Sequence, residues 1–115
     1  MKPQPFDAQV RTQPGLATID LFGEINAFAE NGINTAYATA ETSNPGTVVL
    51  NFTHVTYINS TGIALIVGLL AQARKTHRNL IVYGLSDHYT EIFKITRLSD
   101  FMNIFKDEES LLSSL

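Results

Sequence analysis

Two adjacent hydroxyl side chains, Ser60 and Thr61, are the groups in this chain best placed to do chemistry. They belong to the polar tetrapeptide Asn59-Ser60-Thr61-Gly62, which follows an apolar run typical of a buried strand. A strongly apolar segment comes next and predicts a helix. Because a helix N-terminus offers free N–H groups and partial positive charge, the tetrapeptide is suited to holding a negative charge.

The tetrapeptide has a structural and a regulatory interpretation. In the first, Asn59 or Ser60 caps the helix by accepting hydrogen bonds from its first amides. In the second, Ser60 is a phosphoacceptor, and the added charge of about −1.5 to −2 is received by the helix amides. At an interface with another protein the same charge is costly, because a buried charge needs a partner. Phosphorylation would therefore switch binding and leave the fold intact, and the residues alone leave both interpretations open.

The predicted helix is more apolar than one core-facing stripe requires. Its stripe is Ile63, Ile66, Val67 and Leu70, widened by Ala64, Leu65 and Leu69. The surplus indicates either a surface for docking a partner protein or a helix covered on both faces within the domain.

Apolar runs and turn signals along the rest of the chain predict an α/β domain. The predicted strands are 8–13, 16–22, 47–52, 79–84 and 101–105, and the predicted helices are 27–42, 63–76, 87–97 and 107–115. Pro14-Gly15 predicts a hairpin between the first two strands. The two buried runs at 47–52 and 79–84 predict a parallel βαβ unit with a right-handed crossover.

The first predicted helix begins after Asn26, a good cap residue. Its apolar positions near helical spacing are Phe28, Ile33, Ala36, Tyr37 and Ala40. Asn31-Gly32 is a weak spot in this pattern, so the alternatives are a continuous helix and one that starts late or is broken there.

Composition excludes several classes of function. The chain has 115 residues, 44% of them hydrophobic and 17% charged, which predicts one domain at 8–115 after a lead-in at 1–7. A net charge of −3 gives no footprint for nucleic acid. The run from Ile63 to Ala71 is too short to span a bilayer, so we expect no direct membrane insertion and a cytoplasmic location.

The sequence also lacks the usual signs of an enzyme or a metalloprotein. It contains no cysteine, and His54, His77 and His88 are not at metal-ligand spacing. Ile58 stands where a nucleophile elbow around Ser60 would need glycine. We expect no cofactor, no bound metal and no catalytic residue.

The chain resembles the STAS domain family, the fold of bacterial anti-sigma factor antagonists and of related modules in stressosomes and transporters. The resemblance covers about Ala8 to Leu112 and depends on four segments, at 21–26, 48–62, 79–84 and 95–98. It implies a single α/β domain with a mixed sheet of four to five strands packed against about four helices.

The resemblance also implies a phosphorylation switch. In the family, the serine at the position of Ser60 is phosphorylated by an anti-sigma factor with serine kinase activity, and a phosphatase reverses the modification. The unmodified protein binds the anti-sigma factor and frees the sigma factor. Thr61 is the fallback acceptor. The implied partner-binding residues are Asn26, Asn59, Ser60, Thr61, Gly62, Ala64 and Leu65.

The alternative is a constitutive STAS adaptor in a stressosome-like assembly or a transporter complex, with Ser60 serving only as a cap. The oligomeric state stays open, and a homodimer is among the options. Asn26, Asn51 and Asn59 stand where the family usually carries aspartate. An amide keeps the hydrogen-bonding shape of a carboxylate, and removing a charge about 6 Å from a phosphoserine relieves roughly 1 kcal/mol of repulsion.

Overall fold

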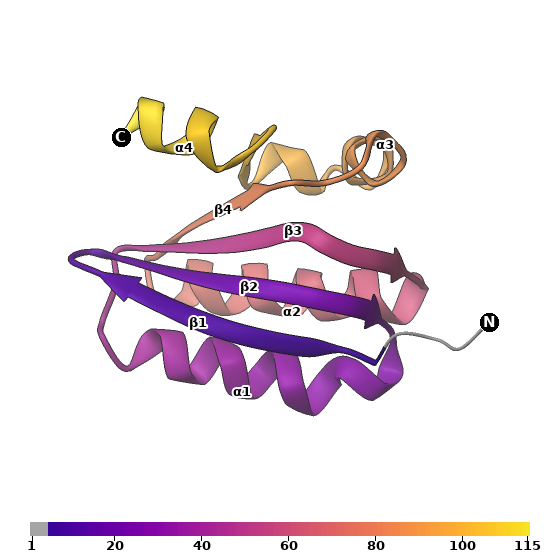
Figure 1. Cartoon of the computed structure of the whole chain (residues 1–115), viewed down its shortest axis with the longest axis horizontal. Helices are drawn as coiled ribbons and strands as arrows, with labels where there is room; N and C mark the ends of the chain where they lie inside the picture. The colour runs from indigo at the N-terminus through magenta and orange to yellow at the C-terminus, as the bar shows by residue number, and fades with distance from the viewer. Residues whose placement is uncertain (1–4) are drawn as a thin grey trace.

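A five-stranded sheet organises the domain, and its strands lie in the order β1-β2-β3-β4-β5. Figure 1 labels β1 to β4. The computed structural model describes residues 5–115, so the first four residues of the predicted lead-in lie outside the described part. The strands are β1 (Asp7–Gln13), β2 (Leu16–Ile25), β3 (Thr47–Ile58), β4 (Asn79–Tyr83) and β5 (Asn103–Phe105). β1 pairs antiparallel with β2, and the other pairs are parallel. The predicted mixed sheet with its N-terminal hairpin is confirmed.

Helices cover both faces of the sheet. They are the 3-10 helix η1 (Ala27–Ala29), α1 (Glu30–Glu41), α2 (Ser60–Lys75), α3 (Asp87–Ile95), the 3-10 helix η2 (Leu98–Asp100) and α4 (Glu108–Ser114). Figure 1 shows α1 and α2 together on one face, with α4 on the opposite side. The main core lies under α1 and α2, and Leu111 of α4 is buried in a smaller core with Val49 and Ile81. The predicted α/β class with four α-helices is therefore confirmed.

β3 is longer than its apolar run predicted, because it continues from Phe52 to Ile58. Its second half pairs only with β2, since its pairing with β4 ends at Asn51. Two bulges in the β2–β3 pairing let β3 follow β2 to its end, where Ile58 lies opposite Ile25. Most of residues 53–57 are exposed, so they lack the apolar signature of a buried strand.

Phe28 does not share the buried face of the other apolar residues that were grouped with it by helical spacing. Phe28 is 96% exposed, and Ala29 is buried in its place. The buried face runs through Ala29, Ile33, Ala36, Tyr37 and Ala40 at spacings of three and four. Phe28 precedes Ile33 by five residues, a spacing that places the two on different faces of a helix.

The apolar stripe of α2 also differs from the prediction at one position. The buried residues of α2 are Gly62, Ile66, Leu69, Leu70 and Ala73. Val67 is 45% exposed, and Leu69 takes its place against the core. α2 therefore keeps an apolar exposed side, as a helix with surplus apolar surface would.

A polar network joins the sheet to α4 on the face away from α1 and α2. The Asp20 carboxylate accepts hydrogen bonds from the Arg11 guanidinium at 2.7 and 2.9 Å and from the Asn51 amide at 2.8 Å. Arg11 also donates to Glu108 at the start of α4, at 3.0 Å. Burial raises the pKa of Asp20, but the hydrogen bonds from Arg11 and Asn51 outweigh burial and hold that pKa below its ordinary value.

This network explains the asparagine at position 51. Its amide nitrogen donates to Asp20, and its amide oxygen accepts from the Thr53 N–H at 2.9 Å. An aspartate there would place two carboxylates within hydrogen-bonding distance and lose the donor. Asn51 therefore serves the sheet and does not belong to the Asn59-Ser60-Thr61-Gly62 site.

Candidate functional site

The junction between β3 and α2 is tighter than a four-residue polar turn. β3 ends at Ile58 and α2 begins at Ser60, so only Asn59 lies between them. The Asn59 side-chain oxygen accepts from the Gly62 N–H at 2.9 Å, and its carbonyl accepts from the Ile63 N–H at the same distance. Of the two predicted caps, Asn59 is confirmed. Ser60 is the first residue of the helix, and capping does not require its hydroxyl.

Ser60 and Thr61 are both exposed at the start of α2. The hydrogen bonds of the cap use the N–H groups of Gly62 and Ile63. Within residues 5–115, the backbone N–H groups of Ser60 and Thr61 have no acceptor. The first turn of α2 carries no acidic residue, and Arg74 and Lys75 lie in its last turn. No charge from the first turn therefore offsets the positive end of the helix dipole, which favours an anion beside the two hydroxyls.

Gly62 allows the start of α2 to lie directly on the end of β2. A Cβ at this position would overlap the Ile25 carbonyl oxygen and would lie 2.9 Å from both the Ile25 carbonyl carbon and Cγ2 of Ile58. The same Ile25 oxygen accepts from the Asn59 N–H at 3.2 Å. Gly62 is thus buried, and its contribution to the site is the close backbone approach that only glycine permits.

Asn26 shapes the neighbouring turn at the end of β2. Its side-chain oxygen accepts from the Phe28 N–H at 2.9 Å, and its carbonyl accepts from the Ala29 N–H at 3.0 Å. The short helix η1 that Asn26 caps packs against α2. Asn26 and Asn59 therefore hold two adjacent turns, and the Ile25 carbonyl joins them.

The structure brings most of the predicted partner-binding residues together at this end of the sheet. Ala64 is exposed one turn beyond Ser60. Leu65 is partly buried and packs against the main core, so only part of its side chain is available to a partner. Exposed and half-buried groups thus continue from the Ser60 turn along α2.

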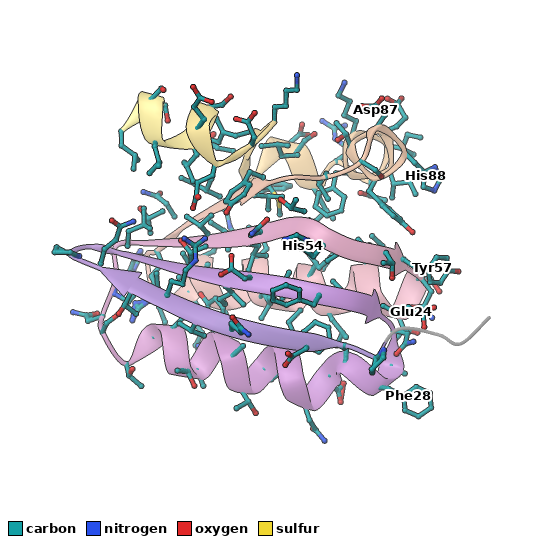
Figure 2. All side chains as sticks on the ribbon, in the orientation of Figure 1. Glu24, Phe28, His54, Tyr57, Asp87 and His88 are labelled. Atoms are coloured by element: carbon teal, nitrogen blue, oxygen red, sulfur yellow. The ribbon has the colours of Figure 1, made fainter. Side chains whose placement is uncertain are left out.

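Two exposed aromatic residues at the same end were not among the predicted site residues. Phe28 is 96% exposed and Tyr57 is 49% exposed. Figure 2 shows Phe28, Glu24 and Tyr57 along one end of the molecule, and Tyr57 lies opposite Glu24 in the β2–β3 pairing. The five-residue spacing from Phe28 to Ile33 was the available signal for Phe28. Tyr57 carried none, because the apolar run ends before it.

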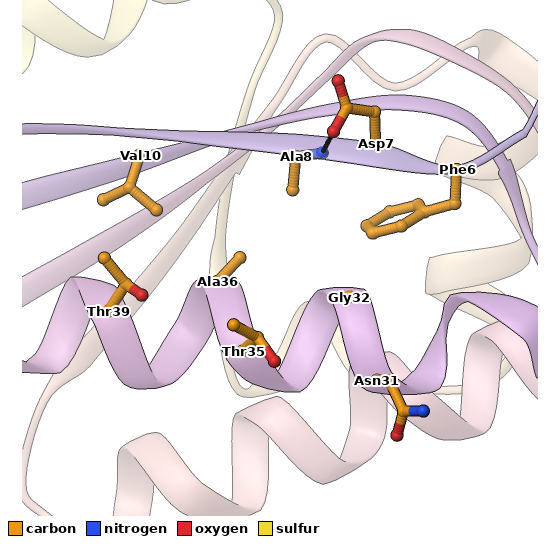
Figure 3. A pocket seen from close by; sticks show the side chains of 9 residues that line it. All are labelled: Phe6, Asp7, Ala8, Val10, Asn31, Gly32, Thr35, Ala36 and Thr39. Carbon is orange, nitrogen blue, oxygen red and sulfur yellow. Dashed lines mark hydrogen bonds between the residues drawn. The ribbon is translucent and has the colours of Figure 1, made fainter.

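A groove between β1 and α1 lies apart from these residues (Figure 3). Phe6, Ala8, Val10 and Thr35 are among the residues that line it, and the Phe6 ring covers Gly32. None of the predicted site residues borders this groove, so the hydroxyl pair remains the candidate functional site.

A family model for the STAS domain matches residues 7–111, which include the whole hydroxyl site and both halves of the sheet. The chain belongs to the STAS domain family. This STAS domain is 33% identical over 88 residues to the anti-sigma-B factor antagonist of Listeria monocytogenes, covering 75% of this chain and 77% of the relative. It is 25% identical over 104 residues to the Staphylococcus aureus protein of the same name, covering 90% and 96%.

Solved structures share the fold. An anti-sigma factor antagonist from Mycobacterium paratuberculosis superposes with a TM-score of 0.83 at 15% identity, covering 98% of this chain and 96% of that chain. SpoIIAA from Bacillus, in its phosphorylated form, superposes with a TM-score of 0.71 at 22% identity, covering 94% and 99%. This STAS domain therefore keeps the family architecture along nearly its whole length.

Two further properties concern residues 5–115. No group of three histidine, cysteine or acidic side chains is arranged to hold a metal ion. No helix in the same range is long and apolar enough to cross a membrane.

Proposed function

We propose that this STAS domain is an anti-sigma factor antagonist that binds an anti-sigma factor and is switched by reversible phosphorylation at Ser60. Two relatives that cover most of the chain bear the name anti-sigma-B factor antagonist. The observation that carries the proposal is the exposed Ser60 hydroxyl, which lies at the first position of α2 and is not needed as a cap. In this proposal the anti-sigma factor is the kinase that phosphorylates Ser60, and a phosphatase removes the phosphate.

The geometry gives the switch a physical basis in the free protein. A phosphate on Ser60 would lie beside the amides of the first helical turn, where the dipole favours it by about 0.3–1 kcal/mol. Asn59 adds no repulsion, because it caps the helix with a neutral amide. Phosphorylation therefore leaves the domain folded, and SpoIIAA, which shares the fold, has a solved structure in a phosphorylated form.

In the complex with the anti-sigma factor, the phosphate is expected to be destabilising. The proposed contact face consists of Asn26, Asn59, Ser60, Thr61, Gly62, Ala64 and Leu65, and a partner on this face covers the Ser60 hydroxyl. A buried charge without a partner costs about 3–5 kcal/mol. Since 1.4 kcal/mol is tenfold in affinity, phosphorylation is expected to weaken binding by about 10²–10³-fold or more.

The direct test incubates the chain with cognate anti-sigma factors and ATP and maps phosphate by mass spectrometry. We expect modification of the wild type and of Thr61→Ala, and none of Ser60→Ala. Modification that persists in Ser60→Ala and disappears in Thr61→Ala moves the switch to the fallback acceptor. Absence of phosphate at both positions with every cognate kinase refutes the switch.

A phosphomimetic separates the switch from a constitutive adaptor. Ser60→Asp is expected to release the anti-sigma factor with an unchanged circular dichroism spectrum. Unchanged binding by Ser60→Asp would favour an adaptor in a stressosome-like assembly or a transporter complex.

Ser86 offers a matched control for the structural role of a helix-start serine. Its hydroxyl oxygen caps α3 by accepting from the Tyr89 N–H at 3.3 Å. Ser86→Ala should therefore lower the free energy of unfolding by about 0.5–2 kcal/mol. Ser60→Ala should change it by less than about 0.5 kcal/mol, as surface substitutions away from caps usually do. A large loss in Ser60→Ala would mean that Ser60 is structural after all.

A further inference from the structure

We propose that Phe28 is the aromatic anchor of the partner interface and inserts into an apolar pocket of the anti-sigma factor that is flanked by lysine or arginine side chains. The inference rests on the proposed function, because it assigns a contact and a partner chemistry to the same end of the molecule. Phe28 itself lies outside the predicted contact face.

The exposure of Phe28 is unusual for its residue type and position. Phe28 is 96% exposed, although its neighbours Ile25 and Ala29 are fully buried. The turn thus buries the side chains of Ile25 and Ala29 and exposes the side chain of Phe28. A large aromatic ring held in this way is the kind of residue that dominates interface affinity.

The turn holds Phe28 in a defined position. The Asn26 side chain accepts from the N–H of Phe28 itself at 2.9 Å, and the Asn26 carbonyl accepts from Ala29 at 3.0 Å. With the backbone fixed on both sides, little backbone entropy is lost when the ring docks. Asn26 is therefore a positioning residue for Phe28.

The anchor and the switch are parts of one rigid unit. The η1 turn packs against α2, and the Ile25 carbonyl accepts from the Asn59 N–H at 3.2 Å. Gly62 brings the start of α2 onto the same carbonyl. A partner that docks on Phe28 therefore also reaches the Ser60 turn.

Charge on this surface indicates the chemistry of the partner. Residues 22–40, which include the Phe28 turn, contain Glu24 and Glu30 and no lysine or arginine. Glu24 lies on the strand that leads into the Phe28 turn, and Glu30 follows the turn at the start of α1. Figure 2 shows Glu24 between Phe28 and Tyr57. An aromatic ring among acids is complementary to an apolar pocket with a basic rim.

The same charges argue against a second copy of this chain as the occupant. A symmetric contact through Phe28 would bring Glu24 and Glu30 of both copies together, and like charges at an interface are unfavourable. The basic rim of the partner faces these two glutamates. The phosphate of Ser60 would instead lie at the N-terminus of α2. Residues 42–73, which include this end of α2, contain no aspartate, glutamate, lysine or arginine.

The test measures the affinity for the cognate anti-sigma factor by isothermal titration calorimetry. Phe28→Ala is expected to weaken binding by about 30-fold or more, the range of an interface hot spot, and Phe28→Leu by less. Phe101→Ala is the matched control, since Phe101 is 53% exposed beside Arg74 in another part of the molecule. It is expected to change affinity by less than about threefold, as neutral surface positions do. Thermal melts of each variant confirm that the fold is retained.

The charge requirement has its own measurement. Glu24→Gln with Glu30→Gln should weaken binding at low salt and reduce its salt dependence, because both charges pair with cations of the partner. An unchanged salt dependence would refute the proposal that lysine or arginine side chains of the partner face these glutamates.

The outcomes distinguish the anchor from the switch. If Phe28→Ala binds as tightly as the wild type while Ser60→Asp still releases the partner, the anchor is wrong and the proposed function stands. If the wild type binds no anti-sigma factor, both fail. A wild-type dimer in analytical ultracentrifugation that Phe28→Ala dissociates would show that a second copy occupies the surface and would overturn the anchor.

Discussion

Replacing Gly62 with alanine tests whether the start of α2 lies against the end of β2 as the structure shows. The new methyl group would overlap the Ile25 carbonyl oxygen and lie 2.9 Å from two further carbon atoms. Two of these three atoms belong to the backbone, so they cannot move aside as a flexible side chain would. The helix start must shift, and the Asn59 N–H to Ile25 hydrogen bond at 3.2 Å is expected to break.

The expected magnitude follows from three contributions. Overpacking of this kind costs about 1–3 kcal/mol, and loss of the hydrogen bond costs about 0.5–1.5 kcal/mol. The preference of helices for alanine over glycine returns about 1 kcal/mol. Gly62→Ala should therefore lower the free energy of unfolding by about 0.5–3.5 kcal/mol.

Gly68 provides a matched control in the same helix. A Cβ at Gly68 has no neighbour within 4 Å, so Gly68→Ala should be stabilising by about 0.5–1 kcal/mol. The same substitution is thus expected to act with opposite sign at two positions six residues apart in α2. For a domain of this size, each kcal/mol corresponds to about 4 °C in Tm.

Urea denaturation and thermal melts followed by circular dichroism measure both variants. If the proposed function holds, phosphorylation at Ser60 and binding of the anti-sigma factor should fall with Gly62→Ala, because the turn that carries Ser60 moves, and should be unaffected by Gly68→Ala. If Gly62→Ala is as stable as Gly68→Ala, the close approach of α2 to Ile25 is wrong, and with it the rigid connection between the two turns.

Two further predictions concern the supporting structure. The pKa of Asp20 lies below its ordinary value in the folded chain despite burial, because Arg11 donates to it, so its stabilising effect is present above about pH 4 and is lost as the pH falls through the folded-state pKa. Asp20→Asn should flatten this acid limb in urea titrations between about pH 2 and 6, and an unchanged slope would contradict the assignment. Tyr89 accepts from the Ile58 N–H at 2.8 Å, so Tyr89→Phe should cost about 1–3 kcal/mol and speed hydrogen exchange of that amide. Tyr37→Phe is the control: the buried Tyr37 hydroxyl has no partner within residues 5–115, so its removal should be neutral or stabilising, and equal losses in both variants would refute the argument.

Local sequence patterns were sufficient for much of the fold. Pro14-Gly15 predicted the hairpin, and the apolar runs at 47–52 and 79–84 predicted two neighbouring parallel strands, all of which the structure confirms. These signals depend on residues within one element or one turn, which is why they can be recognised without knowing the neighbours. The same holds for the location of Ser60 and Thr61 at a helix start.

Features that depend on contacts between distant segments were not accessible in this way. The second half of β3 forms because two bulges keep it paired with β2, and the exposed residues 53–57 give no sign of it. The asparagine at position 51 has its reason in Asp20, which lies 31 residues earlier in the chain.

The site shows the same division. The sequence alone determined that two hydroxyls and a helix-capping residue lie together after a strand, because these are properties of consecutive residues. Only the tertiary structure decided that Asn59 is the cap, that Gly62 lies against Ile25, and that Phe28 is exposed. The physical reason is that capping geometry, close backbone approach and solvent exposure are set by what packs on the segment from elsewhere in the chain.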